Sequence, residues 1–257
     1  MRIFKNIRLK LASENKVLAY LRYAIGEIFL VVIGILIALQ INTWNENRKT
    51  QKKEILIYQE LNSDLLQTKE EIASTIAKHK ERIKSTQNLI HDIVKKEPYS
   101  DTIYNRFARA SDDFQIIPQT SAFESLKNIG LDILSDDSLR IRITNLFELD
   151  YKRFDHLGDE NSEFNISGVL FPYQDKYLFA DYYKTAKYGF KYSDSITVQK
   201  LKIEDYDKFL TDNQLLKALQ VTLYHRSNIV DLETETMIKT GETIKSIEEE
   251  LEKLKKT

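Results

Sequence analysis

An uninterrupted apolar stretch near the N-terminus constrains the fold of this chain more than any other feature. The stretch begins at Ala24, and no Lys, Arg, Asp or Glu occurs between Ile28 and Asn45. At about 1.5 Å per residue, a helix over residues 23–44 is long enough to cross a hydrocarbon layer of ~30 Å. We therefore predict a transmembrane helix over 23–44, with the lipid bilayer as its partner.

A cleaved signal peptide would also combine a basic start with an apolar core. This apolar stretch is longer than a usual signal core, and no small-x-small cleavage site follows it. We therefore expect an uncleaved signal anchor that crosses the membrane once.

A basic arm, residues 1–22, precedes the predicted span. It holds six basic residues and a single acid, Glu14, and its apolar residues recur at helical spacing. Such an arm can lie as an amphipathic helix in the headgroup layer, or it can be a soluble flank that only sets topology. Because fewer basic residues follow the span closely, the positive-inside rule favours a cytoplasmic N-terminus. The rest of the chain would then lie outside the cytoplasm.

The composition excludes several classes of function. A net charge of -1 over 257 residues suggests neither a nucleic acid nor an acidic polymer as a partner. The absence of cysteine excludes disulfides, zinc-thiolate sites and thiol nucleophiles. Seven glycines and three prolines are too few for a turn-rich β-sandwich, so the composition favours a mainly helical fold.

A heptad pattern follows the span and predicts a first stalk helix over 45–97. Eight of its twelve core positions are apolar, and Pro98 ends the run. The positions are Ile55, Tyr58, Asn62, Leu65, Lys69, Ile72, Ile76, His79, Ile83, Thr86, Ile90 and Ile93.

A similar pattern predicts a C-terminal stalk helix over 212–257, with nine of twelve core positions apolar. The positions are Leu216, Leu219, Leu223, Arg226, Val230, Glu233, Met237, Thr240, Ile244, Ile247, Leu251 and Leu254. Neither helix can bury its apolar seam alone, so we expect an antiparallel, coiled-coil-like hairpin. Polar seam residues such as Asn62 and Arg226 can set its register, and we expect Lys69 to face Glu233.

Residues 98–211 are expected to form a mostly helical, aromatic-rich cap at the membrane-distal end of the hairpin. We predict a short helix after Ser100, a possible extended segment at 114–118, and a helix that a Ser121–Glu124 capping box opens and Gly130 ends. A further helix begins after residues 135–138. Its apolar face consists of Leu139, Ile143, Leu146, Phe147, Tyr151 and Phe154.

Ten aromatic residues lie between 164 and 192. They can form the core of the cap, or some of them can line a pocket for a small ligand of unknown identity. The candidate pocket residues are Tyr173, Tyr177, Tyr182, Tyr183 and Phe190.

One face of the predicted span carries a carboxylate and two small residues. At about 100° per residue, the residues on this face are Glu27, Val31, Gly34, Ala38 and Asn45. Glu27 can extend to the headgroups or have a function inside the membrane. Gly34 and Ala38 allow close approach of another helix, either of a second copy or of a membrane-protein partner.

No motif in the sequence carries chemistry. None of His79, His91, His156 and His225 has a metal-ligand spacing, and no nucleophile elbow is present. We therefore predict neither a metal nor a cofactor, and no enzymatic activity.

The run from Tyr23 to Glu46, YAIGEIFLVVIGILIALQINTWNE, resembles the N-terminal signature of an uncharacterised family of single-span membrane proteins from Bacteroidota. Three later segments also resemble this family. They are the segment from Ser121 to Gly130 and the segments around Leu139 and His225. The resemblance implies a Gram-negative inner-membrane protein with one N-terminal span. Because the positive-inside rule favours a cytoplasmic N-terminus, we expect a periplasmic C-terminal domain. The resemblance implies no activity, so no functional residue follows from it.

These features together predict a mainly α protein whose single transmembrane helix continues into a long helical hairpin. We expect a sensor-like or scaffolding module that is not an enzyme and that associates through its span. The alternative is a ligand-binding or enzymatic cap for which the span is only an anchor.

Overall fold

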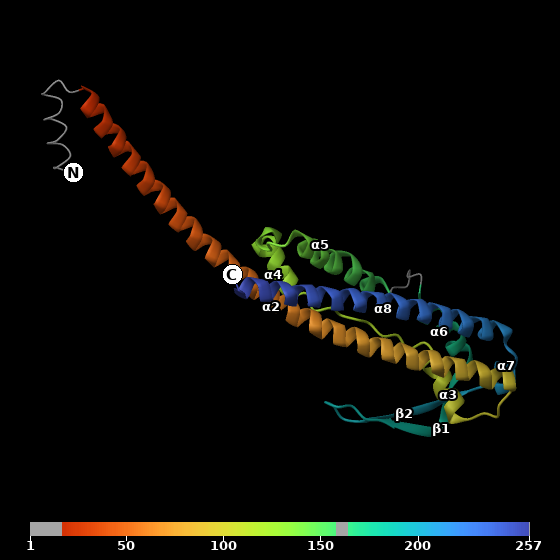
Figure 1. Cartoon of the computed structure of the whole chain (residues 1–257). Coiled ribbons are helices and arrows are strands. Elements are labelled where there is room, and N and C mark those ends of the chain that lie inside the picture. The colour runs from red at the N-terminus through yellow and green to blue at the C-terminus, as the bar shows by residue number, and fades with distance from the viewer. Residues whose placement is uncertain (1–16, 158–163, 257) are drawn as a thin grey trace. The chain divides into compact units, whose positions relative to one another are not determined.

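The computed structural model describes residues 17–157 and 164–256 and has a mainly α fold (Figure 1). The expected basic arm, residues 1–22, lies mostly outside the described residues. The chain divides into two units, residues 1–56 and residues 57–257, which are described separately below. The longest helix, α2, spans Val17–Lys95 and supplies residues to both units.

The first unit contains the apolar stretch as the early part of α2. Its large side chains are exposed, as Ile28, Leu36 and Ile41 show with 64%, 58% and 61% of their surface accessible. After the stretch, Arg48 lies over the ring of Trp44. By length and composition, this one helix among the described residues could cross a membrane.

The second unit is built on an antiparallel pair of helices, α2 from residue 57 onward and α8, Asn213–Lys256. His79 of α2 contacts Arg226 of α8, whereas Leu89 and Ile93 share a core with Leu215 and Leu219. Residues later in α2 therefore contact residues earlier in α8, as in an antiparallel pair. The predicted antiparallel hairpin is confirmed.

The seam of α2 differs from the predicted one by a rotation. The expected positions from Tyr58 to Ile93 that are seven residues apart are buried, and so is the expected Ile76, but the other buried set lies one residue earlier than expected. This set consists of Leu61, Thr68, Thr75, Arg82 and Leu89. The reason is a third segment on this side of α2, where the backbone N–H of Gln119 donates to Thr68 Oγ1 at 3.0 Å.

The expected pairing of Lys69 with Glu233 is wrong. Lys69 is exposed and lies beside Gly241 of α8. A Cβ atom added to this glycine would be 3.2 Å from Lys69 Nζ. Glu233 is buried beside His79 instead, with 3.4 Å between Glu233 Oε1 and His79 Nε2. The helices therefore pair in a register several residues away from the expected one.

The structure corrects the expectation of a single cap over 98–211. Part of this range, residues 114–156, lies alongside α2 and α8 and includes α4 (Ser121–Ile129), η1 (Leu131–Ile133), α5 (Asp137–Asn145), η2 (Leu146–Asp150) and η3 (Tyr151–His156). Ser121 Oγ donates to Asp64 of α2 at 2.9 Å. Tyr151 Oη and Thr240 Oγ1 of α8 lie 3.0 Å apart, and burial raises the pKa of Tyr151.

The helix ends in this region agree in part with those predicted from the sequence. Gly130 ends α4 with φ 111°, and Asp136 caps α5 by accepting from the N–H of Leu139. The predicted capping box is wrong, because Ser121 already lies inside α4 and its hydroxyl bonds to Asp64. The apolar face from Leu139 to Phe154 is confirmed, since all six of its predicted residues are buried.

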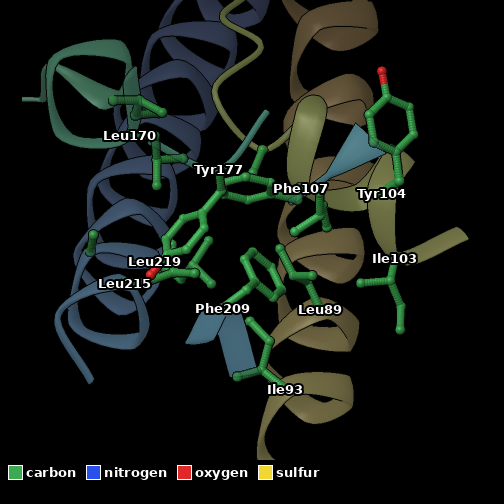
Figure 2. Close-up of a cluster of buried hydrophobic side chains, with 14 of the residues drawn as sticks. Leu89, Ile93, Ile103, Tyr104, Phe107, Leu170, Tyr177, Phe209, Leu215 and Leu219 are labelled. Atoms are coloured by element: carbon green, nitrogen blue, oxygen red, sulfur yellow. The ribbon is translucent and has the colours of Figure 1, made fainter. Parts of the chain in front are cut away.

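The remaining elements gather where α2 ends and α8 begins. They are α3 (Asp101–Ala108), α6 (Ile166–Tyr177), β1 (Leu178–Tyr188), β2 (Ile196–Ile203) and α7 (Tyr206–Thr211). Ser100 caps α3, as predicted. Figure 2 shows Phe209 of α7 within their shared core, near Phe107 and Tyr177. The ring centroid of Phe209 lies 5.0 Å from that of Phe107 and 5.4 Å from that of Tyr177. The sequence did not predict the two strands.

The contact between α4 and α2 can be tested at Asp64, whose Oδ2 accepts from both Ser121 Oγ and the N–H of Ala122. We expect Asp64→Ala to leave these donors without their partner and to destabilise the start of α4 by about 1–2 kcal/mol. Hydrogen exchange of residues 119–126 measures this as faster exchange. The exposed Glu70→Ala on the same helix should leave it unchanged, and equal rates in both variants would contradict the assigned contact.

Candidate functional site

The antiparallel ribbon of β1 and β2, residues 178–203, is the most exposed ordered part of the second unit (Figure 1). Its ladder runs from Leu178 opposite Ile203 to Tyr188 opposite Ile196. Three residues of β1, 182–184, have no partner in the ladder and form a bulge. No third strand joins the ribbon within the described residues, so each strand keeps one unpaired edge.

The root of the ribbon is fixed, whereas its outer part is exposed. Leu178 and Ile203 belong to or pack against the core cluster, and the N–H of Glu204 donates to the carbonyl of Tyr177 at 3.0 Å. In the outer part, Tyr188, Ile196 and Val198 lie on one face of the strands and remain 51%, 49% and 39% exposed. An isolated two-stranded ribbon is only marginally stable, so the ordered root is what holds it.

A cavity of about 230 Å³ lies at the root of the ribbon. It is lined by Tyr99, Asp101, Asp181, Lys184, Lys200, Leu201, Lys202, Ile203 and Tyr206. The rings of Tyr99 and Tyr206 meet edge to face at 5.3 Å. The cavity therefore combines an aromatic wall with three ammonium groups and two carboxylates.

The charges of this cavity are only partly paired. Lys200 Nζ lies 2.8 Å from Asp101 Oδ2, and this hydrogen bond lowers the pKa of Asp101 and raises the pKa of Lys200. Lys184 and Lys202 have no ion pair with any carboxylate that the structure describes. Three lysines and two aspartates in the lining give the cavity a net charge of +1, which favours an anionic group.

The five predicted pocket residues are separated in the structure. Tyr177 is buried in the core, where its hydroxyl donates to Asp212 Oδ2 at 2.7 Å, and Tyr173 packs against the same core. Tyr182, Tyr183 and Phe190 belong to the ribbon and its turn, and they are 76%, 100% and 51% exposed. None of the five lines the cavity at the root. The sequence signal for that cavity is instead the alternation of lysine with apolar residues at 200–203.

The predicted face of the span is open within the first unit. Val31, Gly34, Ala38 and Asn45 are exposed, and Glu27 is partly so. A Cβ built on Gly34 would meet nothing within 4 Å. The structure therefore leaves room for another helix on this face.

A buried chain of polar side chains joins α2 and α8. Arg226 is fully buried, and its Nη2 donates to the carbonyls of Ala110 and Asp112 at 3.0 and 2.7 Å. Its Nη1 lies 3.0 Å from His79 Nδ1, and His79 Nε2 faces Glu233. The chain Arg226–His79–Glu233 thus places a guanidinium and a carboxylate on opposite sides of one imidazole ring.

The hydrogen bonds define the state of this imidazole. A guanidinium can only donate, so His79 Nδ1 must accept and Nε2 carries the proton toward Glu233. Burial lowers the pKa of Arg226 to about 10, although the carboxylates of Asp113, Asp112 and Glu233 act in the opposite direction. Arg226 therefore stays charged at neutral pH. Glu233 is 1% exposed, and its Oε1 lies 3.4 Å from His79 Nε2, but among the described residues neither of its oxygens has a hydrogen-bond partner.

No group of three or more His, Asp or Glu side chains in the described part of the chain could hold a metal ion. Three other features of the described residues are two surfaces, the ribbon and the span face, and one buried polar chain.

Residues 27–169 match DUF6090, a family of unknown function. This match covers more than half of the chain. The chain belongs to this family. The DUF6090 match includes the apolar stretch and α3 to α5, whereas the ribbon and α8 lie beyond it. No curated protein and no solved structure matches the chain significantly.

The buried chain can be tested by removing its members singly and together. We expect Arg226→Met to leave Glu233 as an uncompensated buried charge and to destabilise the protein by about 3–5 kcal/mol. The triple change His79→Leu, Arg226→Met, Glu233→Leu should recover most of this loss, because neither charged end of the polar chain remains. Thermal unfolding of the detergent-solubilised chain measures both effects. Arg153→Met, at a half-exposed arginine, is the control and should change stability by less than about 1 kcal/mol. A triple variant as unstable as Arg226→Met would contradict this account.

Asp212 predicts a pH dependence at the start of α8. Burial raises its pKa, but hydrogen bonds from Lys176, Tyr177 and the N–H groups of Leu215 and Gln214 outweigh burial and hold this pKa well below its usual range. A lowered pKa stabilises the fold above the unfolded-state value of about 3.9, and the stabilisation is lost as the pH falls below it. We therefore expect the protection factors of residues 174–178 and 213–216, which are corrected for the intrinsic exchange rate at each pH, to decrease as the pH falls below about 4. In Asp212→Asn this loss of protection should be much smaller, and identical pH profiles would contradict the prediction.

Proposed function

We propose that this chain is a single-pass membrane protein that acts as an interaction module, sensor-like or scaffolding, and not as an enzyme. The observation that carries the proposal is the sequence of α2. The same helix holds an apolar stretch that is not buried and, farther along, the buried residues on which the second unit is built. From Ile35 to Lys95 it contains no glycine or proline.

The finer parts of the proposal concern location and topology. The resemblance of residues 23–46 to a Bacteroidota signature supports an inner-membrane protein, and the basic arm supports a cytoplasmic N-terminus. The second unit would then be periplasmic, where an absence of cysteine is acceptable. The seven-residue spacing of buried positions in α2 and α8 supports a coiled-coil-like stalk.

Association through the span is the second part of the proposal. Gly34 and Ala38 lie four residues apart on the face that also holds Glu27, and small residues at this spacing let two helices approach closely. A second copy or a membrane-protein partner would occupy this face. The competing function is a tethered binding domain, which the cavity at the ribbon root supports. For that function any apolar span would suffice.

The two functions differ in what they require of the span. We expect an amine-reactive crosslinker to yield a defined adduct of the full chain in native membranes. Gly34→Ile should reduce this adduct at least about fivefold, because the branched side chain prevents close helix approach. Replacement of residues 23–44 by poly-leucine should abolish it.

Gly26→Ile is the matched control for this experiment. Gly26 is equally open but lies about 100° away from the Gly34 face. The adduct should persist in this variant. If all three variants crosslink like the unchanged chain, the span is only an anchor and the proposed function is contradicted.

A further inference from the structure

We infer that the ribbon of β1 and β2 binds an extended acidic peptide segment, which adds as a strand to β2 and places a carboxylate in the cavity at the ribbon root. This inference rests on the proposed function and names the chemistry of one partner. Four independent observations support it: unpaired edges, exposed aromatic residues, local charge and a cavity.

The unpaired edge of β2 is suited to strand addition. All eight residues of β2, Ile196–Ile203, pair in register with β1, so β2 is a regular strand. The edge of β1 is interrupted by the bulge at 182–184, and such bulges disturb further pairing. An incoming peptide can therefore form main-chain hydrogen bonds along β2 more readily than along β1.

The exposed side chains of the ribbon give the partner a surface to contact. Tyr188, Ile196 and Val198 form an apolar face on the outer part, and the bulge projects Tyr182 and Tyr183 into solvent. Large exposed apolar and aromatic side chains in a cluster are typical of binding surfaces.

The local charge selects an acidic partner. Residues 178–203 contain five lysines and two aspartates, a net charge of +3, whereas the whole chain carries -1. Lysines on an edge also discourage self-association, so two copies of the ribbon would repel each other. A second copy is therefore a poor occupant, and an acidic segment is a favourable one.

The cavity supplies a fixed point for one carboxylate. Lys184 from the bulge and Lys202 from β2 both line it and are the two ammonium groups without an ion pair to a described carboxylate. Tyr99 and Tyr206 form its aromatic wall. A Glu or Asp side chain, or a C-terminal carboxylate, matches both the volume and the charge of this cavity.

The inference is tested on the full chain in nanodiscs of neutral lipid by fluorescence anisotropy. The probe is a fluorescein-labelled eight-residue peptide of alternating Val and Glu. Two control peptides replace Glu by Lys, or the two central residues by Pro. We expect the acidic peptide to bind at least about tenfold more tightly than either control. The proline control tests strand pairing, because proline cannot donate to a ladder.

Charge-matched variants locate the site. Lys184→Glu with Lys202→Glu should weaken binding of the acidic peptide at least about tenfold. Lys187→Glu with Lys191→Glu changes the net charge equally but leaves the cavity unchanged, and should weaken binding less than about threefold. Absence of binding, equal binding of the proline peptide, or equal loss in both double variants would overturn the inference. Binding to anionic vesicles in place of the peptide would overturn it too.

The outcome is separable from that of the proposed function. Peptide binding should be unchanged when residues 23–44 are replaced by poly-leucine, because the ribbon belongs to the second unit. Binding without span-dependent crosslinking would contradict only the proposed function. Crosslinking without peptide binding would contradict only this inference.

Discussion

The buried guanidinium of Arg226 is the interaction on which the packing of the second unit depends. It bonds to the carbonyls of Ala110 and Asp112 and to the ring of His79, so it ties the segment after α3, helix α2 and helix α8 together at one point. A buried charge is tolerated only while its partners stay in place, and displacement of any one of them costs several kcal/mol. The guanidinium therefore specifies one arrangement of three segments that are far apart in the sequence.

The polar character of the seam explains why such a specifying contact is needed. Thr222, Thr240 and Thr243 are buried in α8, and each hydroxyl donates to a carbonyl four residues earlier in its own helix. These bonds satisfy the hydroxyls but do not distinguish one pairing of α2 and α8 from another. A heptad seam would keep much of its apolar contact after a shift of seven residues. The polar chain from Arg226 through His79 to Glu233 opposes such a shift, because its members would lose one another as partners.

The difference between local bonds and contacts of distant residues also explains which features could be predicted from the sequence. Local sequence signals predicted the two long helices, the apolar face from Leu139 to Phe154 and the end of α4 at Gly130, because these depend on local spacing and backbone conformation. The register of the hairpin was mispredicted, because the partners of Arg226 lie more than a hundred residues earlier. The ribbon was missed, because an exposed ribbon has no alternation between core and solvent. Its aromatic residues were instead interpreted as a core or as one pocket.

The aromatic residues between 164 and 192 differ in burial before and after Tyr177. Up to this residue the rings are buried or partly covered in most cases, whereas beyond it Tyr182, Tyr183 and Tyr192 are among the most exposed side chains of the second unit. Tyr177 itself is fixed, since Asp212 accepts its hydroxyl and its carbonyl accepts from Glu204. Core packing therefore ends at a rigid root, and the ribbon beyond it gains little from the rest of the chain. The unpaired edges of the ribbon are a template to which another strand can add, which is the physical basis for proposing recognition at the ribbon, whereas the buried chain fixes the register.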